Sequence, residues 1–170
     1  VLDSQTGLNR LMVGPDFEEL RDNLTHIEHG QNLRFDTRSV GSPLLILEHG
    51  FRVKRFANCG AAHRAMDALL HLRETHKFSA QDVERLDVFA PKVHFNNLMY
   101  ERPSTGLESK FSIEHALAIC LAEGECGLDA FEAPAVQRKD IRALYPRIHR
   151  NPIDKLEGEF PTSIEIRLKA

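Results

Sequence analysis

The sequence predicts an α+β domain in which an antiparallel sheet carries helices packed on one side. Three observations favour this class: helix-type and strand-type segments are segregated, the strand-type segments alternate apolar with charged residues, and no repeating strand-helix-strand pattern occurs. The 170 residues, 42% of them hydrophobic, suffice to bury a core without metals or disulfides. We expect residues 1–40 to form a helical flank and residues 41–170 to form the α+β domain.

The first half of the chain predicts two helices with a hairpin between them. Apolar side chains at helical spacing indicate a helix over Pro15–Ile27. Strand-type runs at residues 44–47 and 51–56 flank Glu48-His49-Gly50, and the alternation in the second run is typical of a half-buried hairpin. The next helix is expected from Gly60 to about His76, because a long apolar stripe continues through it.

The second half predicts strands and shorter helices around one long loop. Ser79 to Asp82 has the spacing of a helix N-cap, here a single helical turn that leads into a strand at Leu86–Ala90. A loop from Asn96 to Glu108 precedes a helix over Ser112–Glu123, which ends before Gly124. Two short helices and two strands are expected near residues 128–131, 139–144, 147–150 and 163–169.

Charge and hydropathy exclude several classes of protein. Lysine and arginine total 22 against 25 acidic residues, and this balance, without a long basic run, argues against a nucleic-acid surface. No apolar stretch approaches the roughly 20 residues of a membrane span, and no signal peptide pattern begins the chain. A cytoplasmic location is therefore expected. The chain begins without methionine, which suggests a piece of a longer protein.

The sequence does not predict a metal or cofactor site. Cys59, Cys120 and Cys126 are odd in number and lack CxxC spacing, and the histidines show no HExxH pattern. Neither a nucleophile elbow, nor a phosphate-binding glycine loop, nor a dinucleotide fingerprint occurs. We expect free thiols, no metal and no cofactor.

The segment from Lys54 to His63 contains the strongest candidate chemistry. A strand ending at a fixed cation and turning into a helix start would hold a carboxylate, while His63 exchanges protons with it. Alternatively, Lys54 is part of a solvated strand face and His63 pairs with Asp67 one turn on. Cys59, at the helix start, is either a thiol with increased thiolate character or an inert turn residue.

A second cation precedes the next predicted helix. Lys110 lies just before a predicted N-cap at Ser112, so the loop from Asn96 to Ser109 and this helix start would form a second anion-binding wall. Tyr100 in the loop would add a phenolic proton. The alternative is a capped helix whose lysine lies in water and a loop tyrosine that is only packed.

The order of these segments resembles the MmgE/PrpD family. The run from Lys54 to His63 is followed by an alanine-rich helix, by Ser79-Ala-Gln-Asp-Val83, by Thr105-Gly-Leu-Glu-Ser-Lys-Phe-Ser-Ile113 and by Ala116-Leu-Ala-Ile119, over roughly residues 40–145. The resemblance implies that the chain is the lid-type domain of a two-domain enzyme. The active site would lie in the cleft between this domain and a helical partner domain absent from the chain.

Family members include 2-methylcitrate dehydratase, cis-aconitate decarboxylase and iminodisuccinate epimerase. The resemblance therefore implies a cofactor-independent lyase or isomerase, a homodimer, that acts on a small polycarboxylate or hydroxy acid and is most similar to 2-methylcitrate dehydratase. It implies that His63 and Lys54 are catalytic and that Lys110 binds substrate. From their places in the turn and in the loop, we expect Cys59 and Tyr100 to bind substrate as well. Decarboxylase-like members place a histidine where Cys59 stands, which argues against decarboxylation. An iminodisuccinate epimerase-like isomerase and a non-catalytic anion-binding or assembly domain are the alternatives.

Overall fold

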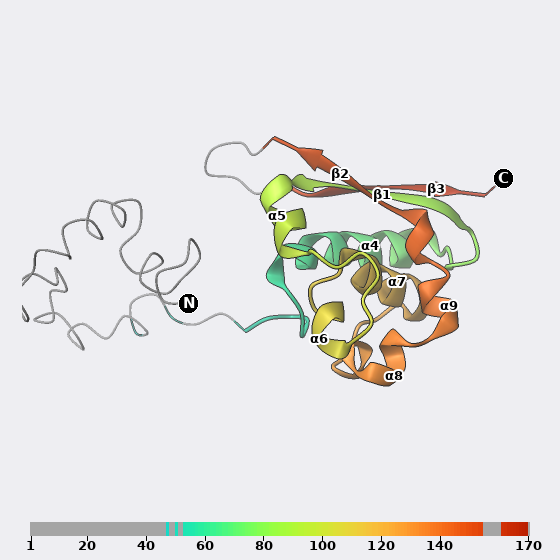
Figure 1. Ribbon diagram of the computed structural model, residues 1–170. Helices are drawn as coiled ribbons and strands as arrows, with labels where there is room; N and C mark the ends of the chain where they lie inside the picture. The colour runs from blue at the N-terminus through green and yellow to red at the C-terminus, as the bar shows by residue number, and fades with distance from the viewer. Residues whose placement is uncertain (1–46, 48–49, 51–52, 155–160, 170) are drawn as a thin grey trace, which may run out of the picture. The chain divides into compact units, whose positions relative to one another are not determined.

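The computed structural model describes residues 47, 50, 53–154 and 161–169. Within Arg52–Ala170 the chain forms one compact unit, in which a sheet makes one layer and the helices another (Figure 1). The helix expected over Pro15–Ile27 and most of the expected hairpin lie outside the described residues. This unit confirms the α+β class predicted from the sequence.

The sheet is mixed rather than purely antiparallel, so this part of the prediction is wrong. Its central strand, β1 (Val83–Pro91), pairs in parallel with β2 (Ile148–Ile153) and antiparallel with β3 (Ser163–Leu168), in the order β2-β1-β3. Parallel neighbours need a long crossover, and here the helices between β1 and β2 provide it. The short strand pattern at residues 147–150 does not indicate whether β2 runs parallel or antiparallel to β1.

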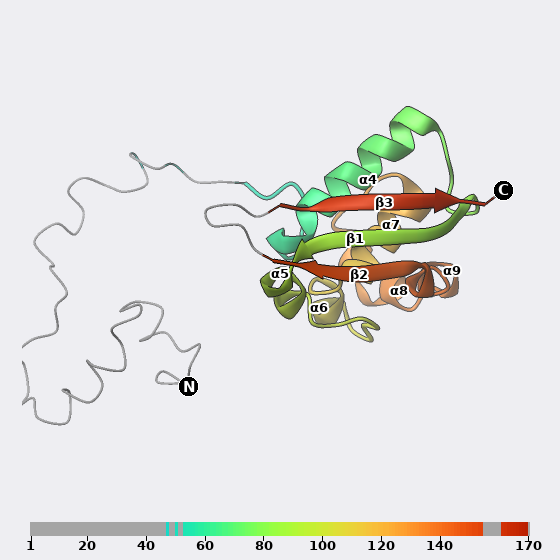
Figure 2. The same cartoon turned by 90° about the horizontal axis from the view of Figure 1, so that it is seen from above.

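The helices form one layer beneath the sheet. Helices α4 and α7 lie under the sheet, α5 lies at its end, and α6 and α8 lie farther away (Figures 1 and 2). The helical elements in chain order are η3 (Gly60–Ala62), α4 (His63–His76), α5 (Lys92–Asn97), α6 (Gly106–Ser109), α7 (Ile113–Glu123), η4 (Asp129–Phe131), α8 (Ala133–Val136), α9 (Lys139–Arg142) and η5 (Tyr145–Arg147), where η marks a 3₁₀ helix.

Two predicted segments have a different local structure. Residues 53–56 belong to neither a helix nor a strand, so the second arm of the expected hairpin is wrong over these residues. Ser79 and Asp82 close a hydrogen-bonded turn instead of a helical turn. The Asp82 carboxylate accepts from the Ser79 N–H at 2.8 Å and from its hydroxyl at 2.7 Å. The expected loop over residues 96–108 is shorter, because α5 and α6 occupy its two ends.

Helix α7 has the boundaries that the sequence predicts. The Ser112 hydroxyl accepts from the His115 N–H at 3.1 Å and caps the first turn. Gly124 takes the left-handed conformation, with φ of 77°, and its N–H donates to the Cys120 carbonyl at 2.9 Å. Every residue from Ile113 to Leu121 is buried, so α7 forms the centre of the core.

Strand β1 covers this core with one of its two faces. Leu86, Val88 and Ala90 are buried beneath the sheet, whereas Asp87 and Phe89 alternate with them on the opposite face and are half-buried. The alternation predicted for residues 86–90 is confirmed. Helices therefore cover one face of the sheet, and no described helix covers the face that carries Asp87 and Phe89.

A buried histidine joins α7 to two neighbouring segments. His115 is fully buried, with Nε2 2.7 Å from the Ala130 carbonyl oxygen and Nδ1 2.8 Å from the Tyr145 hydroxyl. Because a carbonyl only accepts, Nε2 carries the proton and the Tyr145 hydroxyl donates to Nδ1. Burial lowers the pKa of His115 and raises the pKa of Tyr145 to about 12. His115 is thus a neutral structural residue.

Candidate functional site

The candidate site is built on the irregular segment that leads into η3 and α4. Lys54 is exposed, and its ammonium group donates to the carbonyl of Asn58 at 3.2 Å. The side chain therefore folds back over the turn that precedes the helix. This contact holds the Lys54 ammonium group near the helix start, although the strand expected to position it is not formed.

Two buried side chains anchor this segment to the core. Phe56 is 5% exposed and Asn58 is 4% exposed, with the Asn58 amide directed to the sulfur of Met66 at 3.3 Å. Lys54, Phe56 and Asn58 would share one face of a strand, yet Lys54 is exposed whereas the other two are buried. The segment is therefore bent, and Phe56 and Asn58 enter the core.

His63 lies in the first turn of α4 and packs edge-on against Phe56. Their ring centroids are 5.2 Å apart with an interplanar angle of 88°. The expected alternative, an ion pair between His63 and Asp67, is not formed, because Asp67 pairs with Arg55. His63 Nε2 is buried and has no hydrogen-bond partner within the described part of the chain. One nitrogen of this histidine is therefore left for another group.

A backbone hydrogen bond joins the two lysine-bearing turns. The Cys59 N–H donates to the Lys110 carbonyl at 2.9 Å, and the Tyr100 N–H donates to the neighbouring Phe111 carbonyl at 3.2 Å. Lys110 and Tyr100 are exposed, and Cys59 is half-buried. The structure thus brings Lys110 and Tyr100 to the segment that carries Lys54 and Cys59, which is distant from them in sequence, at the start of η3 and α4.

The start of α7 is closed by groups of the protein itself. Ser112 caps it, and Glu114 in its first turn makes two contacts of 2.6 Å with the Arg150 guanidinium. Ser112 and Glu114 are buried, so the helix start does not provide the open anion-binding wall that the sequence suggests. Lys110 lies in the preceding turn, at the end of α6, and its carbonyl meets the Cys59 N–H there.

Two residues that the sequence pattern does not single out lie beside Cys59. A cavity of about 350 Å³ is lined by Cys59, by Arg64 of α4 and by His94 of α5, among others. Burial and the Arg64 charge lower the pKa of His94. In the sequence, the only feature that could have pointed to this cavity was the position of Arg64 next to His63. The contribution of α5 could not be inferred, because the position of that helix depends on the tertiary structure.

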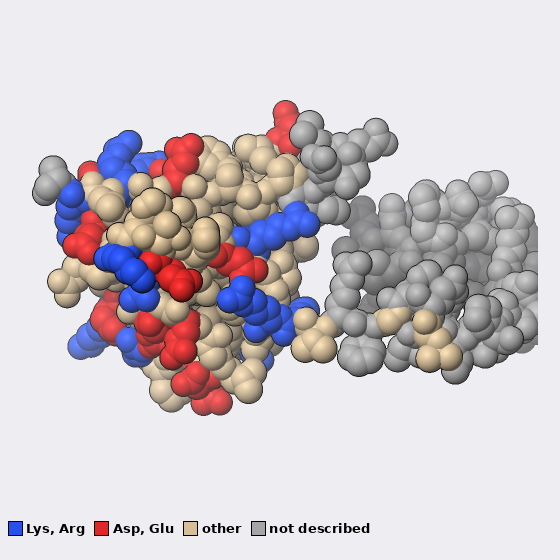
Figure 3. All heavy atoms as spheres, turned by 180° about the vertical axis from the view of Figure 1, so that it is seen from behind, with Lys and Arg blue, Asp and Glu red and all other residues tan. Residues whose placement is uncertain are grey.

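The described residues show neither a metal cluster nor a membrane helix. No group of three or more histidine, cysteine or acidic side chains in that part of the chain is arranged to hold a metal ion. No helix among residues 53–154 is long and apolar enough to cross a bilayer. On the face shown in Figure 3, acidic and basic side chains are interspersed instead of gathered by sign.

The fold and this site define an α+β domain with lysine- and histidine-bearing turns at a helix start. The family model of the MmgE/PrpD C-terminal domain matches residues 56–169, and the chain belongs to this family. Cys59, His63, Tyr100 and Lys110 lie within the matched range, and Lys54 lies just before it. A comparison with curated proteins found no match to the chain.

Proposed function

We propose that this chain supplies one wall of the active site of a cofactor-independent lyase or isomerase. The substrate is a small polycarboxylate or hydroxy acid, and the reaction is most similar to that of 2-methylcitrate dehydratase. The hydrogen bond from the Cys59 N–H to the Lys110 carbonyl carries this proposal, because it places two cation-bearing turns side by side at a helix start. Such an arrangement suits a carboxylate group.

The proposed chemistry begins with removal of a proton next to a carboxylate. Negative charge then builds on the carboxylate, and the ammonium groups of Lys54 and Lys110 stabilise it more strongly in the transition state than in the ground state. His63 is assigned as the proton carrier, since its Nε2 has no partner among the described residues. A buried nitrogen left unpaired costs about 1–3 kcal/mol, so a contact with substrate would be favourable.

The remaining site residues are assigned to substrate binding. Cys59 lines the cavity beside Arg64 and His94, and the Tyr100 N–H is bonded to the turn that holds Lys110. The second wall of the cleft belongs to a helical domain of the parent protein, in a cytoplasmic homodimer. These partners are part of the proposal, as is the lid role of this domain.

The test is the kinetics of three single variants in the full-length parent protein. Lys54→Ala, His63→Ala and Lys110→Ala are expected to lower kcat/KM for methylcitrate or a related acid by about 30- to 1000-fold, or roughly 2–4 kcal/mol. The matched control is Lys139→Ala, which removes an exposed lysine from the start of α9. The control is expected to change kcat/KM by a few-fold at most.

The outcomes separate the candidate functions. If the three variants behave like Lys139→Ala while circular dichroism shows an intact fold, the site assignment is wrong. Turnover of an imino acid with inversion of configuration, and not of methylcitrate, would identify the epimerase-like alternative. Binding of carboxylates without turnover by the full-length protein would identify a non-catalytic anion-binding domain.

A further inference from the structure

The end of α7 brings two cysteines together. The left-handed Gly124 reverses the chain, and its N–H bonds to the carbonyl of Cys120 in the last turn of the helix. Cys126 follows this reversal and packs against the same hydrophobic core that contains Cys120. Cys120 is fully buried, whereas Cys126 is only half-buried. Of the two thiols that flank this reversal, Cys120 is therefore shielded and Cys126 is accessible.

The two thiols affect each other directly. A side-chain hydrogen bond between them is the main reason why the pKa of Cys126 is lowered and the pKa of Cys120 is raised. Burial adds to the effect on Cys120, while the charges of Glu123 and Asp129 oppose the lowering at Cys126. Cys126 is consequently the thiol of the pair that more readily becomes a thiolate, which is the nucleophilic form.

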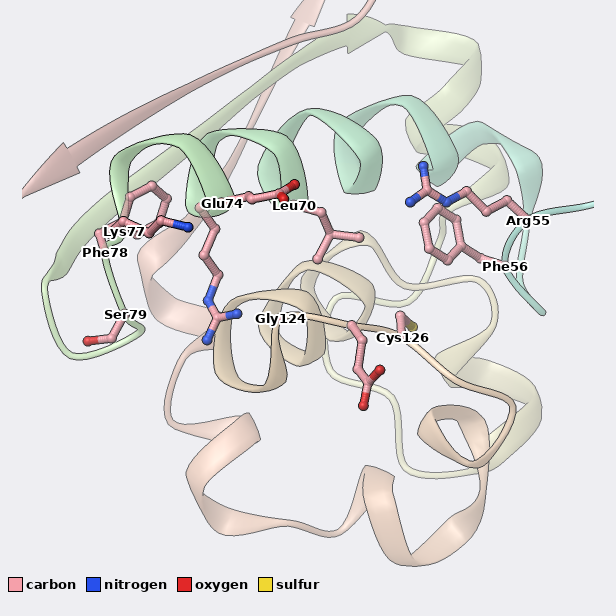
Figure 4. Close-up of a pocket in the computed structure, with 11 residues that line it drawn as sticks. Arg55, Phe56, Leu70, Glu74, Lys77, Phe78, Ser79, Gly124 and Cys126 are labelled. Atoms are coloured by element: carbon pink, nitrogen blue, oxygen red, sulfur yellow. The ribbon is translucent and has the colours of Figure 1, made fainter.

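Cys126 opens onto a groove outside the candidate active site. The groove encloses about 760 Å³ between α4 and the segment after α7, and Cys126 lies toward the end that holds Arg55 and Phe56 (Figure 4). Its charged lining includes cations such as Arg73 and the carboxylate of Glu74. A small disulfide that carries both carboxylates and ammonium groups therefore finds opposite charges for each.

We propose that Cys126 and Cys120 form a reversible dithiol pair that a low-molecular-weight disulfide, such as glutathione disulfide, oxidises through this groove. The Cys126 thiolate attacks one sulfur of the small disulfide, whose sulfur–sulfur bond breaks and whose other half leaves as a thiolate that takes up a proton. Cys120 then loses its proton and attacks the Cys126 sulfur of the mixed disulfide, which releases the second small thiol. In total, two protein thiols are oxidised and one small disulfide is reduced to two thiols.

This inference is independent of the proposed enzymatic function, because the pair and its groove use none of the proposed catalytic or substrate-binding residues. Its product is a disulfide that ties the last turn of α7 to the segment beyond Gly124. The third thiol, Cys59, lies at the other site and serves as an internal comparison. Cys59 has no adjacent thiol among the described residues, so we expect it to form at most a mixed disulfide.

The test uses the folded 170-residue chain and glutathione disulfide. After incubation, free thiols are alkylated, and the peptides are mapped by mass spectrometry without reduction. We expect a Cys120–Cys126 linked peptide that disappears on treatment with a reducing dithiol. The proposal is overturned if Cys126 stays reduced under conditions that modify Cys59, or if Cys126 holds glutathione without forming the link. Formation of the link with hydrogen peroxide but not with glutathione disulfide would overturn the role of the groove.

Two variants check the order of attack. Cys120→Ala removes the second nucleophile and is expected to trap glutathione on Cys126. Cys126→Ser is expected to slow modification of Cys120 by at least about tenfold, because the buried thiol loses its accessible partner. Equal modification of Cys120 with and without Cys126 would contradict this order. The native-chain measurement remains decisive if Cys120→Ala does not fold.

Discussion

Glu114 of α7 and Arg150 of β2 form a two-contact ion pair inside the protein. Arg150 Nε lies 2.6 Å from Glu114 Oε1, and Arg150 Nη2 lies 2.6 Å from Glu114 Oε2. The side chains are 15% and 6% exposed for arginine and glutamate, and the guanidinium also lies 5.7 Å from the centroid of the Phe95 ring. This pair links the central helix to an edge strand of the sheet.

Removing one partner of this pair is expected to destabilise the fold strongly. Arg150→Met leaves the Glu114 carboxylate buried without a counter-charge, and we expect a loss of about 3–5 kcal/mol in the free energy of unfolding, measured in urea. The double variant Arg150→Met with Glu114→Leu should recover most of this loss, because the uncompensated charge is gone. The control Arg138→Met removes a guanidinium that pairs with Asp140 and Glu123 at the surface, and it should change the free energy of unfolding by less than about 1 kcal/mol.

The stability of the fold is expected to fall when the pH drops below about 6.5. Burial holds the pKa of His115 below its ordinary value, so the unfolded chain binds a proton there before the folded chain does. The contribution of His115 is complete above about pH 6.5 and is lost as the pH falls towards the folded pKa. Urea midpoints of the native chain should therefore decrease between about pH 7 and about pH 5.

Two variants identify the residue behind this pH dependence. His115→Gln should reduce the dependence of the urea midpoint on pH. His94→Gln should reduce it by a separate amount, since the pKa of His94 is lowered too. Asp87, whose pKa is lowered to about 2 chiefly by its hydrogen bonds to Arg85, acts only at lower pH. An unchanged slope in His115→Gln would show that His115 is not the responsible group.

Gly106 is expected to resist substitution by alanine. A Cβ atom at this position would lie 2.5 Å from the backbone carbonyl oxygen of Phe131, which cannot move aside as a side chain can. We expect Gly106→Ala to lower the free energy of unfolding by about 1–3 kcal/mol. Gly60→Ala is the matched control, because a Cβ atom there would meet no atom of the described residues within 4 Å. Equal stability of the two variants would contradict the close approach of α6 to η4.

The 170-residue chain alone is expected to show no measurable turnover of methylcitrate, cis-aconitate or related acids. Catalysis needs groups from two walls held in reactive geometry, and the proposed second wall belongs to another domain. The measurement compares the purified chain with the full-length parent at equal concentration. A rate close to that of the parent would show that this domain holds the complete catalytic machinery.

The helices were predictable where a long apolar stripe defined them. Both Gly60–His76 and Ser112–Glu123 combine such a stripe with a recognisable end, and the structure confirms them. The direction of β2 was not predictable, because pairing in parallel or antiparallel depends on the path of the intervening chain. The alternation that predicted a strand around Lys54 was misleading, because the apolar Val53, expected on its buried face, is 85% exposed and residues 53–56 form no strand.

The proximity of the site residues was only partly predictable. Helix-start residues such as Cys59 and Lys110 could be selected individually, because local sequence determines where helices begin. Their connection is a backbone hydrogen bond between distant segments, to which side-chain identity contributes nothing. Arg64 and His94 were missed for a related reason: the cavity beside Cys59 exists only once α5 has packed against the start of α4.

The strand order β2-β1-β3 also determines when the sheet can form during synthesis. The central strand β1 leaves the ribosome well before either neighbour, since β2 begins at Ile148 and β3 at Ser163. Until β2 and β3 are synthesised, both edges of β1 lack partners, and the N–H and C=O groups along these edges stay unpaired. These long-range pairings favour slow folding. A nascent chain that stalls before Ile148 therefore exposes a central strand with two open edges, and we expect it to depend on chaperones or to aggregate.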